Sequence, residues 1–305
     1  MASPLHGLVD ALAMWAEDRR RRPPAGFRPR APAPLDCFGP LPALPPPPAP
    51  EAGPWRAPSP RPAAGDAAMS VVARRARLPR RGTAVLVPPW KVPALGAVDA
   101  WTRLLARQGL DVWTLVPPRH LQRAAPGVRS GEGFVSPDLA ALAAAMEQLV
   151  LEVRVLLALA RTRGGEVVLA GLSLGALGAA LAATAPEAPD AAALIAPPAD
   201  LEAVLSTTPI GRRYRALAAR AGAPLPPRDA VAPMLAPFRP GARRPTARRT
   251  FLAAGREDRI APPGDAFVLA RAWGIEPRLY PRGHLTLLFA CRAVRRDLAR
   301  FLAAR

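Results

Sequence analysis

The chain has 305 residues, of which half are hydrophobic and only 21% are charged, so its composition predicts one large folded domain with an appended tail or insertion. Its formal net charge of +19 comes almost entirely from arginine, because Lys91 is the only lysine. We find no zinc-finger pattern, RNA-stacking aromatic motif or basic helical stripe that would make nucleic acid the partner of this charge. Attraction of the positively charged chain to acidic lipid head groups is the alternative that the sequence leaves open.

The first 50 residues carry two different patterns. Leu8, Leu12 and Trp15 recur at helical spacing, which predicts a short amphipathic helix that is solvated, or that rests on a surface or partner. From Arg22 to about Arg61 prolines recur every few residues, which favours extended or polyproline backbone over helix or central strand. We therefore assign residues 1–50 to a helix and a partly disordered proline-rich tail outside the core.

Cysteine usage and hydropathy indicate the compartment. Cys37 lies in the proline-rich tail and Cys291 at an apolar position of the last predicted helix, so we expect neither a disulfide framework nor a thiolate metal site. Acidic residues interrupt the apolar positions near the N-terminus and no basic segment precedes them, unlike in a signal peptide. No apolar run reaches the roughly eighteen residues that a membrane helix needs. The sequence therefore predicts a cytoplasmic protein, with peripheral membrane contact left open.

Residues 69–73 predict an antiparallel edge strand, and short apolar runs then alternate with helical stretches. Strands are expected at 84–87, 112–116, 167–170, 192–195, 251–254 and 278–280, and helices near 97–107, 137–161, from 173, near 265–273 and after 284. Because strands that alternate with helices pair in parallel, residues 51–305 are predicted to form an α/β domain with an open, mostly parallel, doubly wound sheet. An irregular helical stretch at about 197–249 predicts a cap insertion. The last helix carries an apolar stripe from Leu287 to Phe301 and should pack on the sheet.

Residues 171–175, Gly-Leu-Ser-Leu-Gly, follow a predicted strand directly and open a helix of small residues. A sharp strand-to-helix turn needs glycine where side chains would collide, and it raises its central residue above the sheet. Ser173 is therefore a candidate nucleophile. The backbone N–H of Leu174, at the helix N-terminus, can donate to an oxyanion. The alternative is a glycine-rich turn with a structural serine.

A serine hydroxyl needs a general base, and the base needs a carboxylate that orients it. His284 is the candidate base, because it lies between the last predicted strand and the last helix. Asp258, in the loop after the strand at 251–254, is the candidate acid, with Glu257 and Asp200 as alternatives. The chain order serine, aspartate, histidine is then the one that α/β-hydrolases use.

These motifs resemble the α/β-hydrolase superfamily from about Trp55 to the C-terminus. More narrowly, residues 118–120 and 129–138 resemble a segment of a little-characterised bacterial branch of serine hydrolases. The resemblance implies the α/β-hydrolase fold, with Ser173, Asp258 and His284 as a catalytic triad.

The loop after the first parallel strand departs from this branch. The branch usually has His-Gly-Trp there, where this chain has Pro88, Pro89 and Trp90. It also usually has a second glycine directly after the strand-to-helix turn at 171–175, called the nucleophile elbow, where this chain has Ala176. Proline has no N–H, so the second oxyanion donor must come from Trp90 or Lys91, and the resemblance implies Trp90. Residues 87–90 are also similar to the corresponding segment of polyhydroxyalkanoate synthases. Those enzymes have cysteine at the elbow, whereas this chain has Ser173, so thioester polymerisation is not the favoured reaction.

No glycine-rich nucleotide-binding fingerprint follows the first parallel strand, and we expect neither a cofactor nor a metal. The apolar faces of the cap, with Trp90, suit an acyl chain. We therefore expect a serine hydrolase that cleaves a carboxylic ester, small or lipid-like, through an acyl-enzyme. Two alternatives stay open: a weak or inactive α/β-hydrolase-fold interaction protein, and an acyltransferase that uses the same residues. The oligomeric state is not predicted.

Overall fold

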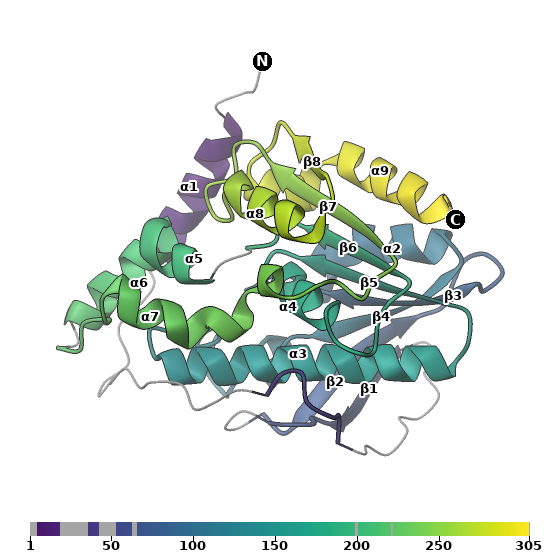
Figure 1. Ribbon diagram of the computed structural model, residues 1–305, viewed down its shortest axis with the longest axis horizontal. Coiled ribbons are helices and arrows are strands. Elements are labelled where there is room, and N and C mark those ends of the chain that lie inside the picture. The colour runs from purple at the N-terminus through teal and green to yellow at the C-terminus, as the bar shows by residue number, and fades with distance from the viewer. Residues whose placement is uncertain are drawn as a thin grey trace.

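The computed structural model describes residues 5–18, 36–42, 53–62, 66–198, 201–220 and 222–304. In this part of the chain, eight strands form one sheet with helices on both faces (Figure 1). The strands are β1 (Gly53–Pro58), β2 (Ala68–Arg74), β3 (Gly82–Val87), β4 (Leu110–Val116), β5 (Glu166–Leu172), β6 (Ala191–Ile195), β7 (Arg249–Gly255) and β8 (Pro277–Tyr280). Their order across the sheet is β1-β2-β4-β3-β5-β6-β7-β8.

The sheet is parallel from β4 through β3, β5, β6 and β7 to β8, whereas β1 and β2 are antiparallel to their neighbours. Where two paired parallel strands are also consecutive in the sequence, at least one helix connects them. Parallel pairing requires such a crossover connection. The mostly parallel α/β class predicted from the alternation of strands and helices is confirmed.

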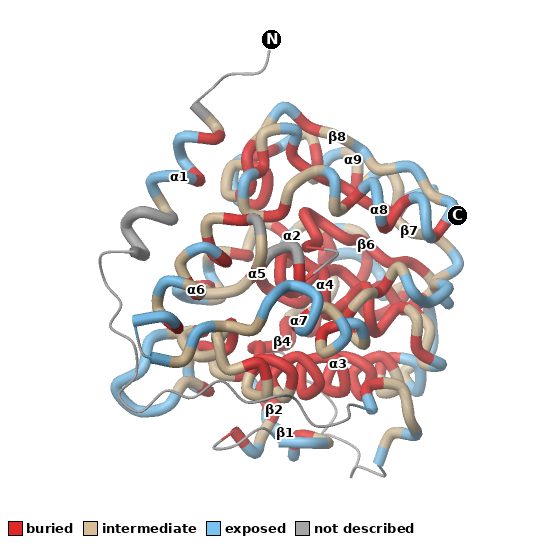
Figure 2. The backbone as a smooth tube through the Cα atoms, turned by 60° about the vertical axis from the view of Figure 1, so that its left-hand side comes forward, coloured by how far each residue is buried: buried red, intermediate tan, exposed pale blue. Residues whose placement is uncertain are grey.

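Three layers of structure bury two apolar clusters, one on each face of the sheet. The helices are α1 (Leu5–Asp18), α2 (Asp99–Arg107), α3 (Leu139–Thr162), α4 (Leu174–Ala182), α5 (Leu201–Thr207), α6 (Pro209–Arg220), α7 (Arg228–Leu235), α8 (Pro263–Trp273) and α9 (Arg292–Ala303). Helices α3, α4 and α8 cover one face, and α2 and α9 cover the other (Figure 1). Figure 2 shows α3 buried along most of its length, whereas α6 and α7, between β6 and β7, carry more exposed residues.

The edge of the sheet is corrected by the structure. Residues 69–73 do lie in an antiparallel strand, β2, but β1 pairs outside it and forms the edge. No strand was predicted at residues 53–58, which lie near the end of the proline-rich stretch. Pro54 and Pro58 are tolerated there because an edge strand leaves one side of its backbone unpaired.

A second piece of the proline-rich stretch also belongs to the fold. Cys37 is buried, and its carbonyl accepts a hydrogen bond of 2.8 Å from the Arg154 guanidinium of α3. Arg154 in turn pairs with Glu187 at 2.8 Å. Residues 19–35 and 43–52 of the predicted helix and tail lie outside the described residues.

The predicted last helix is two segments. Residues Thr286–Ala290 form a π-helical turn, Cys291 is extended with φ −80° and ψ 103°, and α9 starts at Arg292. The wide turn begins two residues after His284, and such turns often mark functional sites. None of the described helices is long and apolar enough to cross a membrane.

Candidate active site

Ser173 occupies the turn between β5 and α4 with φ 55° and ψ −119°. This left-handed backbone is strained for a residue with a side chain, and it persists only where the surroundings hold it. The Ser173 N–H donates to the Ile195 carbonyl of β6 at 2.9 Å, and its carbonyl accepts from Ala176 at 2.8 Å. The turn is thus fixed from both the sheet and the helix.

The two glycines of the turn have no room for a side chain. A Cβ on Gly171 would collide with the Gly175 carbonyl oxygen, and one on Gly175 would collide with the Val87 carbonyl oxygen at the end of β3. The close packing of the turn against β3 explains why both positions are glycine.

Ser173, His284 and Asp258 form a hydrogen-bonded row. Ser173 Oγ lies 2.7 Å from His284 Nε2, and His284 Nδ1 lies 2.6 Å from Asp258 Oδ2. The other carboxylate oxygen of Asp258 accepts from the backbone N–H of Ile260 at 2.9 Å and of Ala261 at 2.7 Å. A carboxylate at Nδ1 favours the tautomer whose Nε2 lone pair faces the serine hydroxyl.

The charge state of His284 follows from its neighbours. Burial lowers the pKa of its imidazole, but the charge and hydrogen bond of Asp258, with the charge of Asp10, outweigh burial and raise the pKa above its ordinary value. The carboxylates thus stabilise the imidazolium that forms when the ring takes a proton.

Of the alternative acids, Glu257 does not take this position. Both oxygens of its carboxylate are buried and make no hydrogen bond in the described part of the chain. Asp200 lies outside the described residues. Asp258 is therefore the acid that contacts the His284 ring.

The loop after β3 is supported by the segment from Pro118 to Gly131. Lys91 has φ 59°, and its backbone N–H donates to His120 Nε2 at 3.0 Å. The Trp90 indole donates to the Gly131 carbonyl at 2.8 Å. Of the two candidate oxyanion donors, the backbone N–H of Lys91 thus donates to His120. The backbone N–H of Trp90 stays the candidate donor.

The role of His120 was not predicted from the sequence, although residues 118–120 belong to the segment that resembles a branch of serine hydrolases. His120 Nδ1 donates to the Pro118 carbonyl at 2.8 Å, which leaves Nε2 as the acceptor for Lys91. Burial lowers the pKa of His120 to about 4, so the ring is neutral near pH 7 and its acceptor is retained.

Two cavities meet at Ser173. The larger, of about 260 Å³, is lined by Ser173, His284 and apolar side chains, among them Ala13, Leu288 and Phe289. The smaller, of about 50 Å³, is lined by Leu174 and by residues from α3, α5, α6 and two loops: Val135, Leu142, Leu201, Leu205, Ile210 and Ile260. Ser173 and Trp90 line both cavities. The hydrogen-bonded row of Ser173, His284 and Asp258 therefore opens onto two mostly apolar cavities.

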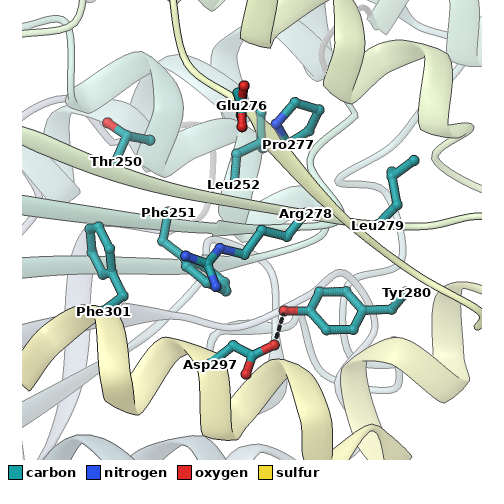
Figure 3. A pocket seen from close by; sticks show the side chains of 10 residues that line it. All are labelled: Thr250, Phe251, Leu252, Glu276, Pro277, Arg278, Leu279, Tyr280, Asp297 and Phe301. Atoms are coloured by element: carbon teal, nitrogen blue, oxygen red, sulfur yellow. Dashed lines mark hydrogen bonds between the residues drawn. The ribbon is translucent and has the colours of Figure 1, made fainter.

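A cavity of about 530 Å³ at the β8 edge of the sheet contains none of these residues (Figure 3). Among its lining residues, the Tyr280 hydroxyl donates to Asp297 at 3.0 Å, and the Arg278 guanidinium lies over the Phe251 ring. Burial and then Asp297 raise the pKa of Tyr280, so it offers no activated nucleophile. Within the described ranges, no cluster of His, Cys, Asp or Glu is arranged to hold a metal ion.

Solved structures identify the fold. An acetyl xylan esterase from Paenibacillus sp. R4 is similar with a TM-score of 0.57 and 13% identity, over 100% of this chain and 95% of its own. A hyperthermophilic esterase from the archaeon Pyrobaculum calidifontis has a TM-score of 0.51 and 16% identity, over 78% of this chain and 79% of its own. An acylaminoacyl peptidase from Pyrococcus horikoshii has a TM-score of 0.56 and 10% identity, over 78% of this chain and 39% of its own.

The chain therefore has the α/β-hydrolase fold that the sequence motifs predicted. At these identities the likeness establishes the fold and not the reaction, because one fold hosts many functions. No protein-family model matches the sequence, and the comparison with curated proteins found no match either.

The neutral state of His120 predicts a pH dependence of stability. The unfolded state takes up a proton near the ordinary pKa of 6.5, whereas the folded state does so only near 4. Stability from this group is therefore complete above pH 6.5 and falls by about 3 kcal/mol as the pH drops to 4. We expect His120→Gln, which keeps an acceptor for Lys91, to lack this loss in denaturant unfolding at several pH values. The same pH dependence in both proteins would contradict a buried, neutral His120.

Proposed function

We propose that this chain, which has the α/β-hydrolase fold, is a serine hydrolase that cleaves a carboxylic ester through an acyl-enzyme. The observation that carries the proposal is the hydrogen-bonded row of Ser173, His284 and Asp258 at the junction of two apolar cavities. Its similarity to esterases of the same fold supports a hydrolase of ester type.

The first step forms the acyl-enzyme. Ser173 Oγ attacks the ester carbonyl carbon while His284 Nε2 takes the hydroxyl proton, and Asp258 stabilises the resulting imidazolium. The carbonyl oxygen becomes an oxyanion that the backbone N–H groups of Leu174 and Trp90 bind. His284 then gives its proton to the leaving alcohol oxygen, and the bond between carbonyl carbon and alcohol oxygen breaks.

The second step releases the acid. Water attacks the carbonyl carbon of the acyl-enzyme, and His284 takes the proton from that water. The tetrahedral intermediate collapses, the proton returns to Ser173 Oγ, and the carboxylic acid leaves. The enzyme is restored, and one water has been consumed for each ester.

The two cavities divide the substrate between them. The leaving oxygen must lie near His284, which protonates it, and His284 lines the larger cavity. The acyl chain then extends into the smaller cavity, beside Leu174. Because its volume of about 50 Å³ is much the smaller of the two, we propose a short acyl chain with a larger apolar leaving group.

We expect a fluorophosphonate probe to label the wild-type chain and to spare Ser173→Ala, because the probe reacts only with an activated serine. The kcat for p-nitrophenyl acetate should fall at least roughly 10⁴-fold in Ser173→Ala. Ser206→Ala, which removes a hydroxyl that donates to Glu202 in α5, is the matched control and should be labelled like wild type. Equal labelling of Ser173→Ala, or no labelling of wild type, would sink the proposal and favour an inactive interaction protein.

We expect p-nitrophenyl acetate to react at least roughly tenfold faster than the octanoate ester, because the smaller cavity excludes long chains. Leu205→Ala enlarges that cavity and should raise the hexanoate-to-acetate ratio of kcat/KM by about tenfold. Phe289→Ala, which changes only the larger cavity, should leave this ratio unchanged. A ratio that responds to Phe289→Ala and not to Leu205→Ala would reverse the assignment of the two cavities.

A further inference from the structure

Helix α1 places a carboxylate against the loop that carries His284. Asp10 is fully buried, and its Oδ2 accepts from the backbone N–H of His284 at 2.6 Å while Oδ1 accepts from that of Leu285 at 3.0 Å. These residues are more than 270 positions apart in the chain. We propose that Asp10 is a positioning residue that holds the His284 loop from the N-terminal helix. This inference rests on the proposed function, because it assigns Asp10 to that reaction.

The two hydrogen bonds satisfy the backbone N–H groups of His284 and Leu285, which otherwise need an acceptor. His284 and Leu285 directly precede the π-helical turn Thr286–Ala290, and the first N–H groups of a helix have no acceptor within it. Aspartate is a preferred residue for capping such groups, and its charge interacts favourably with a helix N-terminus. Asp10 therefore acts as a cap that a distant helix supplies.

The packing around this contact is close. A Cβ on Gly283 would lie 2.6 Å from Asp10 Oδ2 and 2.6 Å from the His6 carbonyl oxygen, so α1 and the loop touch only because residue 283 is glycine. A Cβ on Gly7 would lie 3.2 Å from Nε of Arg259, the neighbour of Asp258. Helix α1 thus packs against both the loop that carries His284 and the loop that carries Asp258.

Helix α1 also forms part of the substrate site. It lies on the outside of the molecule next to α6 (Figures 1 and 2), and its Ala13 lines the larger cavity together with Ser173 and His284. The side of the helix that carries Asp10 is therefore built into the site, whereas Leu8 and Leu12 are about half exposed at 52% and 54%.

Two carboxylates act on the His284 imidazole from different elements. The pKa of the Asp10 carboxyl is raised above its ordinary value, because burial and then the charge of Asp258 outweigh the lowering by the hydrogen bonds from Leu285 and His284 and by the His284 charge. When His284 becomes positively charged, Asp258 and Asp10 both stabilise it. Further titratable or charged groups on the elements packed around this pair are His6, Lys91, Glu257, Arg259 and Arg282.

Two substitutions separate the roles of Asp10. Asp10→Asn keeps the shape and one acceptor oxygen but removes the charge, whereas Asp10→Ala removes both. Asp229→Asn makes the same chemical change at an exposed position of α7 and is the control. For each protein we would measure kcat and KM for p-nitrophenyl acetate against pH, and titrate the His284 ring by NMR.

We expect kcat to fall by roughly tenfold to hundredfold, more in Asp10→Ala than in Asp10→Asn, with KM changed by less than about twofold. The pKa of His284 should move down in both variants, because a negative charge near the imidazolium is lost, and the acid limb of kcat/KM should move to lower pH. Asp229→Asn should match wild type.

An unchanged kcat and an unchanged His284 titration in Asp10→Asn and Asp10→Ala would overturn the inference, as would a rise in KM alone. If circular dichroism shows that Asp10→Ala is unfolded, Asp10→Asn decides the question. The NMR titration needs no turnover, so it tests the action of Asp10 on His284 even in a wild-type protein that hydrolyses no ester. Loss of the proposed function is recognised separately, by a wild type that the fluorophosphonate probe does not label.

Discussion

The strained backbone of Ser173 is the constraint on which the rest of the site depends. Its φ of 55° is held by the Ile195 carbonyl on one side and the first turn of α4 on the other. Gly171 and Gly175 let this turn press against the end of β3, which brings the loop with Trp90 beside the hydroxyl. A parallel sheet makes the arrangement available, because the loops after β3, β5, β7 and β8 all leave the same edge.

Much of this could be predicted from the sequence, because the signals are local. Glycines spaced around a serine at a strand end predict a tight turn whatever surrounds it. The alternation of apolar runs with helical stretches predicts parallel strands, and the sheet order then brings loops that are far apart in the chain to one edge. Asp258 and His284 were found because their elements end at that edge, and they lie within hydrogen-bonding distance of one another.

What the sequence analysis missed depends on contacts between distant segments. The role of Asp10 comes from two backbone N–H groups more than 270 residues away, and no local pattern indicates such a partner. His120 was noted only as a histidine after a strand, yet its buried neutral ring accepts from Lys91 in another loop. Strand β1 was missed because proline disfavours strands in general, and only its position at the edge makes it tolerable. In each case the structure depends on contacts between segments that are far apart in the chain.

A crystal structure of the covalent adduct with a phosphonate ester would test the central claim most directly, because the phosphonyl group mimics the tetrahedral intermediate. We expect phosphorus bonded to Ser173 Oγ, and its oxygen within about 3 Å of the backbone nitrogens of Leu174 and Trp90. The acyl mimic should lie in the smaller cavity and the leaving-group side in the cavity with His284. An adduct on another residue, or an oxygen that contacts neither amide, would contradict the account.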